Sequence, residues 1–330
     1  MLDQQFLLEK CMGQGGSSRV YQAEHLQSQT KYAVKIIRKD KNICQKKGAK
    51  MLQEEHDRMV KLQDHPNVLK SLGAFTEGSL CTEVGATNVQ YNVLEIAEKG
   101  SFAGLIRKIG GLGQTLVKFP FIQICSAVQY IHSQGIAHMD LKLDNILLDE
   151  FYNCKVADLG VSLDVSTSNG FTDSKRGTVC YMAPEIHYLL PTETYDAYKA
   201  DIYSLGVCLY ALLFGELPIK KDDDESTLHD SDTLTTITGL KCSLDCKKKW
   251  SQLPEELQDL LSCMLSLEPD ERPDLDEILE YPWLKEAFHQ DMPAYFYNEV
   301  EKIVENVSNE ASSFMKQEGC LEDIFSSLAF

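Results

Sequence analysis

The stretch His138-Met139-Asp140-Leu141-Lys142-Leu143-Asp144-Asn145, followed by Ala157-Asp158-Leu159-Gly160, decides the fold. It gathers aspartates, a lysine and an asparagine beside the apolar runs Ile136-Ala137 and Ile146-Leu147-Leu148. Polar groups in a loop between strand-like runs suit phosphate chemistry, because Mg²⁺ prefers a few carboxylate or carboxamide oxygens and keeps its phosphate ligands. A solvated turn would also be polar, but it does not explain the ordered spacing.

A glycine-rich loop lies near the start of the chain, Gly13-Gln14-Gly15-Gly16-Ser17-Ser18. Strand-like residues follow it, whereas a dinucleotide-binding loop would run into a helix. In a strand–turn–strand setting, glycines let backbone amides approach phosphates without a side-chain clash. A plain glycine-rich hairpin explains this loop equally well when it is considered alone.

Lys35 lies in a strand-like segment, Tyr32-Ala33-Val34-Lys35. An inward-facing lysine needs an anionic partner, because an unpaired buried ammonium is very costly. Glu55 on the following helix is the expected partner, with Glu54 as the second choice. The alternative is an edge lysine that reaches water.

The order of patterns predicts an α+β fold in two unequal lobes. Apolar alternation predicts strands within 6–37 and near 68–76 and 89–96. Spacings of three and four predict helices at 46–62, 115–134, 197–214, 254–266 and 274–280. A small sheet-rich lobe with one main helix is therefore followed by a larger helical lobe.

Composition restricts the partners and the compartment. The 330 residues carry 32 basic and 50 acidic side chains, a net charge of −18, so phosphate-rich nucleic acids and anionic membranes would be repelled. No stretch reaches the length of an uncharged membrane span, and Met1–Phe6 does not resemble the start of a signal peptide. The 11 cysteines include no C-x-x-C pair, and Cys242 with Cys246 lacks a second pair for zinc. We expect a cytoplasmic protein, with nuclear access left open.

The glycine loop, the strand lysine, the helix glutamate, the Asp140 loop and Asp158-Leu159-Gly160 follow one another along the chain. In this order of motifs the chain resembles the eukaryotic protein kinase family, from about residue 6 to 284. Further matches are Ala183-Pro184-Glu185, Asp201-Ile202-Tyr203-Ser204-Leu205-Gly206 and Glu271-Arg272-Pro273. The resemblance implies a bilobal fold with a small antiparallel sheet in the first lobe. It places the N-lobe at about 6–96, the hinge at about 95–101 and the C-lobe at about 102–284.

The same resemblance implies transfer of the γ-phosphoryl group of ATP to a protein hydroxyl. Asp140 would receive or orient the proton of the substrate hydroxyl, and Lys142 would neutralise charge on the phosphoryl group. Asn145 and Asp158 would hold two Mg²⁺ ions. The α- and β-phosphates would be held by Lys35, oriented by Glu55.

The nucleotide site is assigned by resemblance too. Leu94 occupies the gatekeeper position, the backbone from Glu95 to Ala97 would bond adenine, and Ser101 would meet ribose. Aliphatic side chains would enclose the adenine. The residues assigned to nucleotide binding are Gly13, Gly15, Ser18, Val20, Ala33, Lys35, Leu94, Glu95, Ala97, Ser101 and Leu147.

The segment from Gly177 to Glu185 resembles the serine/threonine version of the segment that seats the substrate. Thr178 would bond Asp140 and Lys142. We also expect Glu185 to pair with Arg272, and Asp201 to support the backbone of the catalytic loop. His138 would pack in a core column with Met59 and Leu159 rather than act as a base.

Met139 stands where the family commonly has the arginine of His-Arg-Asp. That arginine commonly pairs with a phosphorylated residue of the activation loop, and a methionine cannot hold a phosphate. We therefore expect activity that does not require phosphorylation of this loop. Its candidate acceptors are Ser166, Thr167, Ser168, Thr172 and Ser174. The other departure, Ser18 in place of the third glycine, is mild because serine can donate to phosphate.

Two alternatives to an active serine/threonine kinase remain at this level. A pseudokinase scaffold would signal by binding alone, and a small-molecule phosphotransferase would lack a peptide-seating segment. Asp144 and the acidic run 222–225 suggest protein substrates with basic residues near the acceptor, although a solvated acidic loop explains the run equally well.

The tail at 285–330 lies beyond the family resemblance. It carries an apolar stripe at helical spacing, from Val300 to Phe314, and a terminal cluster made of Leu321, Ile324, Phe325, Leu328 and Phe330. The tail is either a helix packed on the C-lobe or a regulatory segment that binds a partner or its own kinase domain.

Overall fold

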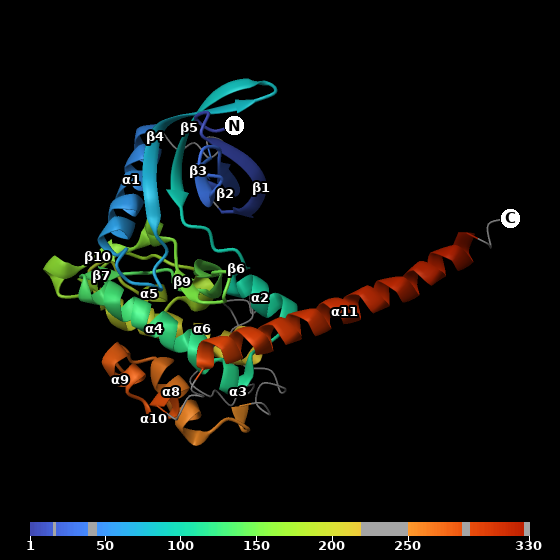
Figure 1. Ribbon diagram of the computed structural model, residues 1–330. Helices are drawn as coiled ribbons and strands as arrows, with labels where there is room; N and C mark the ends of the chain where they lie inside the picture. Colours follow the sequence, from blue (N-terminus) through green and yellow to red (C-terminus); the bar gives the residue numbers. More distant parts are fainter. Residues whose placement is uncertain (16–17, 39–44, 219–249, 286–290, 327–330) are drawn as a thin grey trace.

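A five-stranded antiparallel sheet of order β1-β2-β3-β5-β4 forms the first lobe (Figure 1). The computed structural model describes residues 1–15, 18–38, 45–218, 250–285 and 291–326, the last sixteen of these by backbone alone. The strands are β1 Phe6–Gln14, β2 Ser18–His25, β3 Lys31–Ile37, β4 Ser71–Thr82 and β5 Gly85–Leu94. Helix α1, Gln45–Lys61, packs across β4 and β5 on one face. The other face buries a separate apolar cluster that includes Val34, Tyr91 and Val93.

The second lobe is helical, as the sequence predicts. Its helices are α2 Phe102–Ile109, α3 Gly113–Leu116, α4 Lys118–Ser133, α5 Pro184–His187, α6 Ala197–Phe214, α8 Glu255–Met264, α9 Leu275–Leu279, α10 Pro282–Lys285 and α11 Met292–Ser326. Three small sheets complete this lobe. They are β6 Gly100–Ser101 with β8 Ile146–Leu148 and β9 Cys154–Val156; β7 Ile136–Ala137 with β10 Leu163–Asp164; and β11 Phe171–Thr172 with β12 Tyr195–Asp196.

Helix α6 is the centre of the C-lobe core. Nearly all its residues are buried, and its apolar side chains belong to the main hydrophobic cluster of the protein. Among the described residues it is the one helix with the length and hydropathy of a membrane span, but 83% of that window is buried inside the protein. A helix that is apolar all round and covered on all sides is a core helix.

The structure differs from the sequence prediction at two helices. The single helix expected at 115–134 is divided at Val117 into α3 and α4. Pro120 explains the division, because it has no N–H to donate to the carbonyl of Leu116 and is tolerated in the first turn of α4. Helix α2 was not predicted; Ser101 caps it, accepting a hydrogen bond from the amide of Gly104 at 3.2 Å.

The β4–β5 hairpin is longer than the two predicted strands. Pairing continues to Thr82 and Gly85, where Gly85 has φ +138°, a conformation that favours glycine. The N-terminal residues support the hairpin: Leu2 bridges to Leu80, and Asp3 accepts hydrogen bonds from the amide of Ser79 and the hydroxyl of Tyr91, both at 2.5 Å. These contacts join parts of the chain that no local pattern connects.

Candidate active site

The catalytic loop begins after β7, and Asp201 of α6 fixes its backbone. The buried carboxylate of Asp201 accepts from the amide of His138 at 2.7 Å and from that of Met139 at 2.9 Å. Met139 has φ +67°, a left-handed conformation that is uncommon for a residue with a side chain. Paired acceptance by one buried carboxylate stabilises this turn, as the resemblance implied for Asp201.

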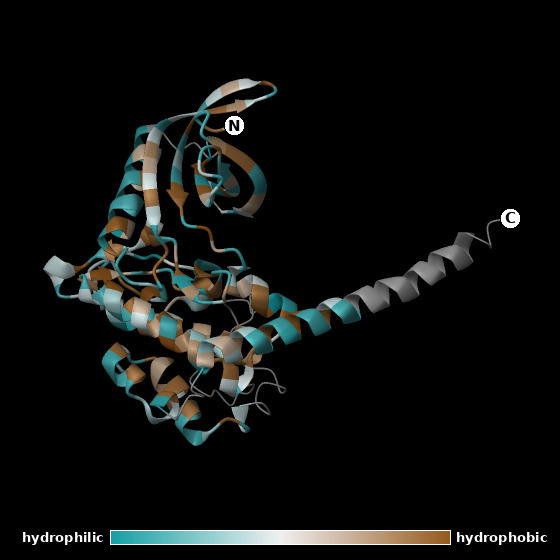
Figure 2. Ribbon diagram, viewed as in Figure 1, coloured by the Kyte–Doolittle hydropathy of each residue, from teal (hydrophilic) through white to brown (hydrophobic). Residues whose placement is uncertain are grey.

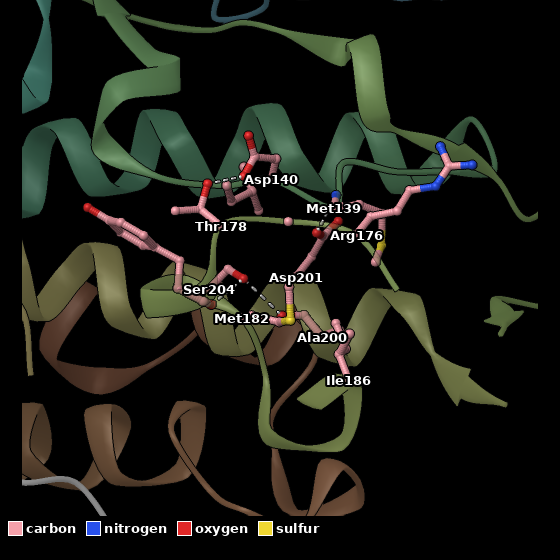
Figure 3. A pocket seen from close by; sticks show the side chains of 12 residues that line it. Met139, Asp140, Arg176, Thr178, Met182, Ile186, Ala200, Asp201 and Ser204 are labelled. Carbon is pink, nitrogen blue, oxygen red and sulfur yellow. Dashed lines mark hydrogen bonds between the residues drawn. The ribbon is translucent and has the colours of Figure 1, made fainter. Parts of the chain in front are cut away.

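Asp140, Lys142 and Thr178 form a hydrogen-bonded triangle. Lys142 Nζ donates to Asp140 Oδ2 and to Thr178 Oγ1, both at 2.7 Å. The Thr178 hydroxyl in turn donates to Asp140 Oδ1 at 2.7 Å (Figure 3). The contacts expected for Thr178 are confirmed, and they place a carboxylate and an ammonium at one point of the cleft.

Asn145 ties the end of the loop to its beginning. Its amide Nδ2 donates to the carbonyl oxygen of Asp140 at 2.8 Å and to the Asp140 carboxylate at 3.1 Å. Because the nitrogen faces Asp140, the amide oxygen of Asn145 is turned away from that carboxylate. This orientation leaves an oxygen donor for a cation.

Lys35 reaches from β3 to two carboxylates. Its Nζ lies 2.7 Å from Glu55 Oε1 and 2.9 Å from Asp158 Oδ1, so the expected Glu55 partner is confirmed and a second, Asp158, is added. Burial alone would lower the pKa of Lys35, but the two carboxylates raise it above its ordinary value. The Lys35 ammonium likewise lowers the pKa of Asp158. Glu54, the second choice, lies instead beside Lys50 and Arg58.

The residues present fit a magnesium site that is completed by phosphate. The backbone of Asp158 has φ +63°, which turns its side chain at the start of a short 3₁₀ turn, and that side chain is 48% exposed despite the bond to Lys35. Asp158 and Asn145 therefore offer one carboxylate and one carboxamide, the hard oxygen donors Mg²⁺ takes. No group of three or more His, Cys, Asp or Glu side chains able to hold a metal occurs within the described ranges. Two protein donors suit an ion that keeps phosphate and water ligands.

The aliphatic residues assigned to adenine come from three neighbouring strands of the sheet, β2, β3 and β5, and from β8 of the second lobe. Ala33 of β3 pairs directly with Leu94 of β5, and both are buried in the main hydrophobic cluster. Val20 and Leu147, partly buried, pack against the same cluster from β2 and β8. All four aliphatic side chains therefore lie in the main hydrophobic cluster or pack against it.

The hinge is held by the backbone at both ends. The amide of Glu95 donates to the carbonyl of Lys70 at 3.0 Å, and the amide of Gly100 donates to that of Ala97 at 3.2 Å. Ser101 uses its hydroxyl oxygen as the acceptor that caps α2. Its expected contact with ribose has to share that oxygen with the cap.

The glycine loop connects β1 and β2 as a hairpin. Gly13 pairs with Val20, and the amide of Gly15 donates to the carbonyl of Ser18 at 2.9 Å. Ser18 is buried at the start of β2. The expected strand–turn–strand context is therefore present; residues 16 and 17 lie outside the described part.

The segment from Gly177 to Glu185 is anchored at both ends. A Cβ on Gly177, whose φ is +116°, would lie 2.7 Å from the carbonyl oxygen of Met139, so only glycine fits this close approach. At the other end, the fully buried Arg272 makes a bidentate pair with Glu185, with distances of 2.7 and 2.8 Å. The expected pairing of Glu185 with Arg272 is confirmed.

A small cavity lies beneath the catalytic loop, between the loop, α6 and the Gly177–Glu185 segment (Figure 3). Met139 lines it together with Met182 and Ile186, while Arg176 extends away from Asp140 and donates to the carbonyl of Val161 at 3.0 Å. The lining of this cavity is therefore mixed, because polar residues such as Thr178, Asp201 and Ser204 line it beside the apolar ones.

His138 is a core residue. It is fully buried, and its Nδ1 accepts from the amide of Asp140 at 3.2 Å. Since a backbone amide can only donate, Nε2 carries the ring hydrogen, which it donates to the carbonyl of Ala157 at 3.1 Å. Met59 and Leu159, its expected neighbours, are both buried in the main hydrophobic cluster. Both ring nitrogens are engaged, which favours the structural role.

Some contacts were not anticipated. His132 Nε2 lies 2.9 Å from Asp201, and Arg58 donates to the carbonyl of Leu159 at 3.2 Å. No motif of the sequence pointed to either. The acidic run 222–225, the Cys242–Cys246 pair and the terminal apolar cluster of the tail fall outside the residues whose side chains the structure describes.

Comparison with known proteins agrees with this geometry. A family model described as a protein kinase domain matches residues 6–284. Curated relatives include the cell cycle serine/threonine-protein kinase CDC5/MSD2 of Saccharomyces cerevisiae, 31% identical over 94% of this chain and 41% of that protein. CBL-interacting protein kinase 2 of Oryza sativa subsp. japonica is 31% identical over 95% of this chain and 66% of that protein. The SNF-related serine/threonine-protein kinase of Homo sapiens is 33% identical over 96% of this chain and 38% of that protein. The chain spans between about a third and two thirds of the length of these relatives.

Proposed function

The chain belongs to the protein kinase family, and from this premise we propose that it is an active, ATP-dependent serine/threonine protein kinase. The observation that carries the proposal is the hydrogen-bonded triangle of Asp140, Lys142 and Thr178 beside the Lys35–Glu55–Asp158 network. A scaffold that only binds partners has no need to hold these groups at hydrogen-bonding distance. The complete set therefore favours catalysis over the pseudokinase alternative.

Each of these side chains has a role that follows from its charge and position. Asp140 is the acceptor for the proton of the attacking hydroxyl, as the new oxygen–phosphorus bond forms and ADP leaves. The Lys142 ammonium, fixed by Asp140 and Thr178, offsets negative charge on the phosphoryl oxygens. Lys35, oriented by Glu55, binds the α- and β-phosphates. Positioning and electrostatic stabilisation supply most of the catalysis in such a site.

ATP is the phosphoryl donor of the family, and Mg²⁺ bound by the phosphates supplies positive charge that neutralises them during transfer. Asn145 and Asp158 are the residues that would hold it. Lys35 lowers the pKa of Asp158, which further favours its ionised form.

Serine and threonine are the proposed acceptors. Lys142 beside the catalytic aspartate and the Gly177–Glu185 segment both resemble the serine/threonine type, and two of the three relatives compared are named as serine/threonine-protein kinases. The anchored segment also favours a protein substrate over a small molecule, because it builds an ordered surface beside Asp140.

Basic residues near the acceptor are a secondary part of the proposal. Asp144 lies 3.7 Å from Arg107, with side chains 52% and 69% exposed, so its charge is partly offset within the protein. Regulator binding is proposed on the names of the CBL-interacting relatives and on the tail beyond residue 284. A cytoplasmic location remains a prediction from composition.

Transfer of radiolabel from γ-labelled ATP to a generic protein substrate tests the proposal. The wild type should label serine and threonine, and Asp158→Ala should abolish the labelling. Asp270→Ala, which removes an exposed carboxylate far along the chain, is the matched control and should label normally. A wild type that binds ATP but transfers no label, whatever substrate is offered, would contradict the proposal and favour the scaffold.

A further inference from the structure

Helix α11 begins on the kinase domain and then leaves it. Phe296 and Val300 on its first turns are fully buried, and the Phe296 ring lies 5.2 Å from that of Phe119 on α4. Further along, Val304 and Val307 are only partly buried, and the helix projects away from both lobes (Figure 1). Along its described side chains, hydrophobic and hydrophilic residues alternate (Figure 2). The first part of the tail is therefore packed on the C-lobe, which is one of the two arrangements that the sequence allows.

Where α11 passes the hinge, four side chains meet. Glu301 Oε1 lies 2.5 Å from Lys99 Nζ and accepts a hydrogen bond from the Tyr152 hydroxyl at 2.8 Å. The Lys99 ammonium also lies 4.6 Å from the centre of the Tyr152 ring and 5.7 Å from that of Tyr297, within range of cation–π attraction. We call Lys99, Tyr152, Tyr297 and Glu301 the hinge latch.

The hinge latch holds the part of the hinge that leads to the nucleotide site. Lys99 follows Ala97 and precedes Ser101, and its amide donates to the carbonyl of Leu148 at 3.1 Å. The next two residues pair with β8, Gly100 with Leu148 and Ser101 with Leu147. A displacement of Lys99 would therefore move the hinge backbone that is expected to bond adenine. It would also move Leu147, one of the residues assigned to nucleotide binding.

We propose that Glu301 is a positioning residue for nucleotide binding, acting through Lys99 and Tyr152 to hold the hinge and β8 in their binding arrangement. This inference rests on the proposed function for the identity of the ligand, ATP. Glu301 and Tyr297 lie beyond residue 284, where the match to the kinase family ends, so the tail supplies two of the four latch residues.

The electrostatics of the latch agree with a persistent contact. Hydrogen bonds from Lys99 and Tyr152 lower the pKa of Glu301. Burial, followed by the hydrogen bond to Glu301, raises the pKa of Tyr152 to about 12, so its hydroxyl stays protonated and donates at neutral pH. Lys99 and Glu301 are only 31% and 27% exposed, which makes the pair less screened than an open surface ion pair.

The test compares two glutamates on the same helix. Glu301→Ala removes the acceptor shared by Lys99 and Tyr152, while Glu299→Ala removes the partner of Lys302, 2.6 Å away, a pair confined to the surface of α11. ATP affinity is measured by calorimetry with Mg²⁺ present, and KM for ATP and kcat are measured separately. We expect Glu301→Ala to weaken ATP binding and to raise KM for ATP about five-fold, with kcat unchanged. Glu301→Gln should raise KM for ATP about two-fold, and Glu299→Ala should leave both ATP affinity and KM unchanged.

A double-mutant cycle with Lys99→Met separates positioning from general destabilisation. If the latch acts as one unit, the reduction in ATP affinity in Lys99→Met plus Glu301→Ala will be smaller than the product of the two single reductions. Equal ATP affinity in Glu301→Ala and Glu299→Ala would overturn the inference, as would a decrease confined to kcat. Weaker ATP binding in Glu301→Ala, in a protein whose wild type transfers no phosphoryl group, would support the latch while refuting the proposed kinase activity.

Discussion

Thr178→Val is the change that tests most directly how the catalytic aspartate is held. Valine keeps the shape of threonine but replaces the hydroxyl by a methyl group. The hydroxyl donates to Asp140 Oδ1 and accepts from Lys142 Nζ, both at 2.7 Å. The substitution therefore removes two hydrogen bonds with charged partners while the backbone of the segment, anchored by Glu185 and Arg272, stays in place.

The hydrogen bonds that Asp140 keeps in the variant determine how large the loss of activity should be. Lys142 still donates to Asp140 Oδ2 and Asn145 still donates to the same oxygen, so that side of the carboxylate keeps its partners. At Oδ1 the variant lacks one hydrogen bond to a charged group, and such a bond is worth about 1.5–3 kcal/mol. If that energy orients Asp140 in the transition state, kcat/KM falls by about 10- to 150-fold.

The assay is steady-state phosphorylation of a peptide, with KM for ATP measured alongside. Thr178→Ser keeps the hydroxyl and should retain activity within about three-fold of wild type, and ATP binding should be unchanged in both variants. A Thr178→Val enzyme as active as the wild type would refute the reasoning. Equal decreases in Thr178→Ser and Thr178→Val would assign the effect to the methyl group of threonine and refute it too.

Three further predictions follow from the ion pairs and the loop. Glu185→Ala leaves the fully buried Arg272 without its carboxylate and should destabilise the domain by about 3–5 kcal/mol, lowering Tm by about 6–10 °C; a change under 2 °C by calorimetry would contradict this. Alanine at Ser166, Thr167, Ser168, Thr172 and Ser174 together should preserve peptide phosphorylation, and its disappearance would show that the loop needs phosphate. Because Lys35 lowers the pKa of Asp158 below its ordinary 3.8, their pairing stabilises the fold above that pH and is lost as pH falls through the lowered pKa. The difference in unfolding free energy between wild type and Lys35→Met, from urea titrations, should therefore shrink below about pH 4, and a constant difference would count against the pairing.

Much of the fold was predictable because its signals are local. Strand alternation around Lys35, the helical spacing of α1 and the apolar stretch of α6 each follow from neighbouring residues, and all three elements are found. The division at Val117 depends on one missing N–H at Pro120, which a periodicity of apolar residues does not register. The extended hairpin depends on residues 1–3, far away in the sequence.

In the candidate site too, contacts within known motifs could be predicted from the sequence, whereas contacts set by the tertiary fold could not. Pairs between family motifs, such as Lys35 with Glu55, were predicted because the motifs supply both members. The additional bond from Lys35 to Asp158 and the contact of His132 with Asp201 arise from the folded arrangement of the loops. The hinge latch was least predictable, because Lys99 and Glu301 are ordinary surface residue types about 200 positions apart and only tertiary packing brings them together.

Met139 bears directly on how this kinase would be regulated. A phosphate on the activation loop stabilises a kinase when it meets a cation at this position, and here the side chain is a 5%-exposed thioether. It lines a small cavity with both apolar and polar residues, among them Met182 and Arg176. The loop backbone has other supports: Asp201 holds residues 138 and 139, Tyr195 donates to the carbonyl of Ser174 at 2.5 Å, and Gly177 lies directly against Met139. Because these supports are all made by residues of the chain, and Met139 offers no cation to a phosphate, we expect control at the tail and the hinge rather than at the activation loop.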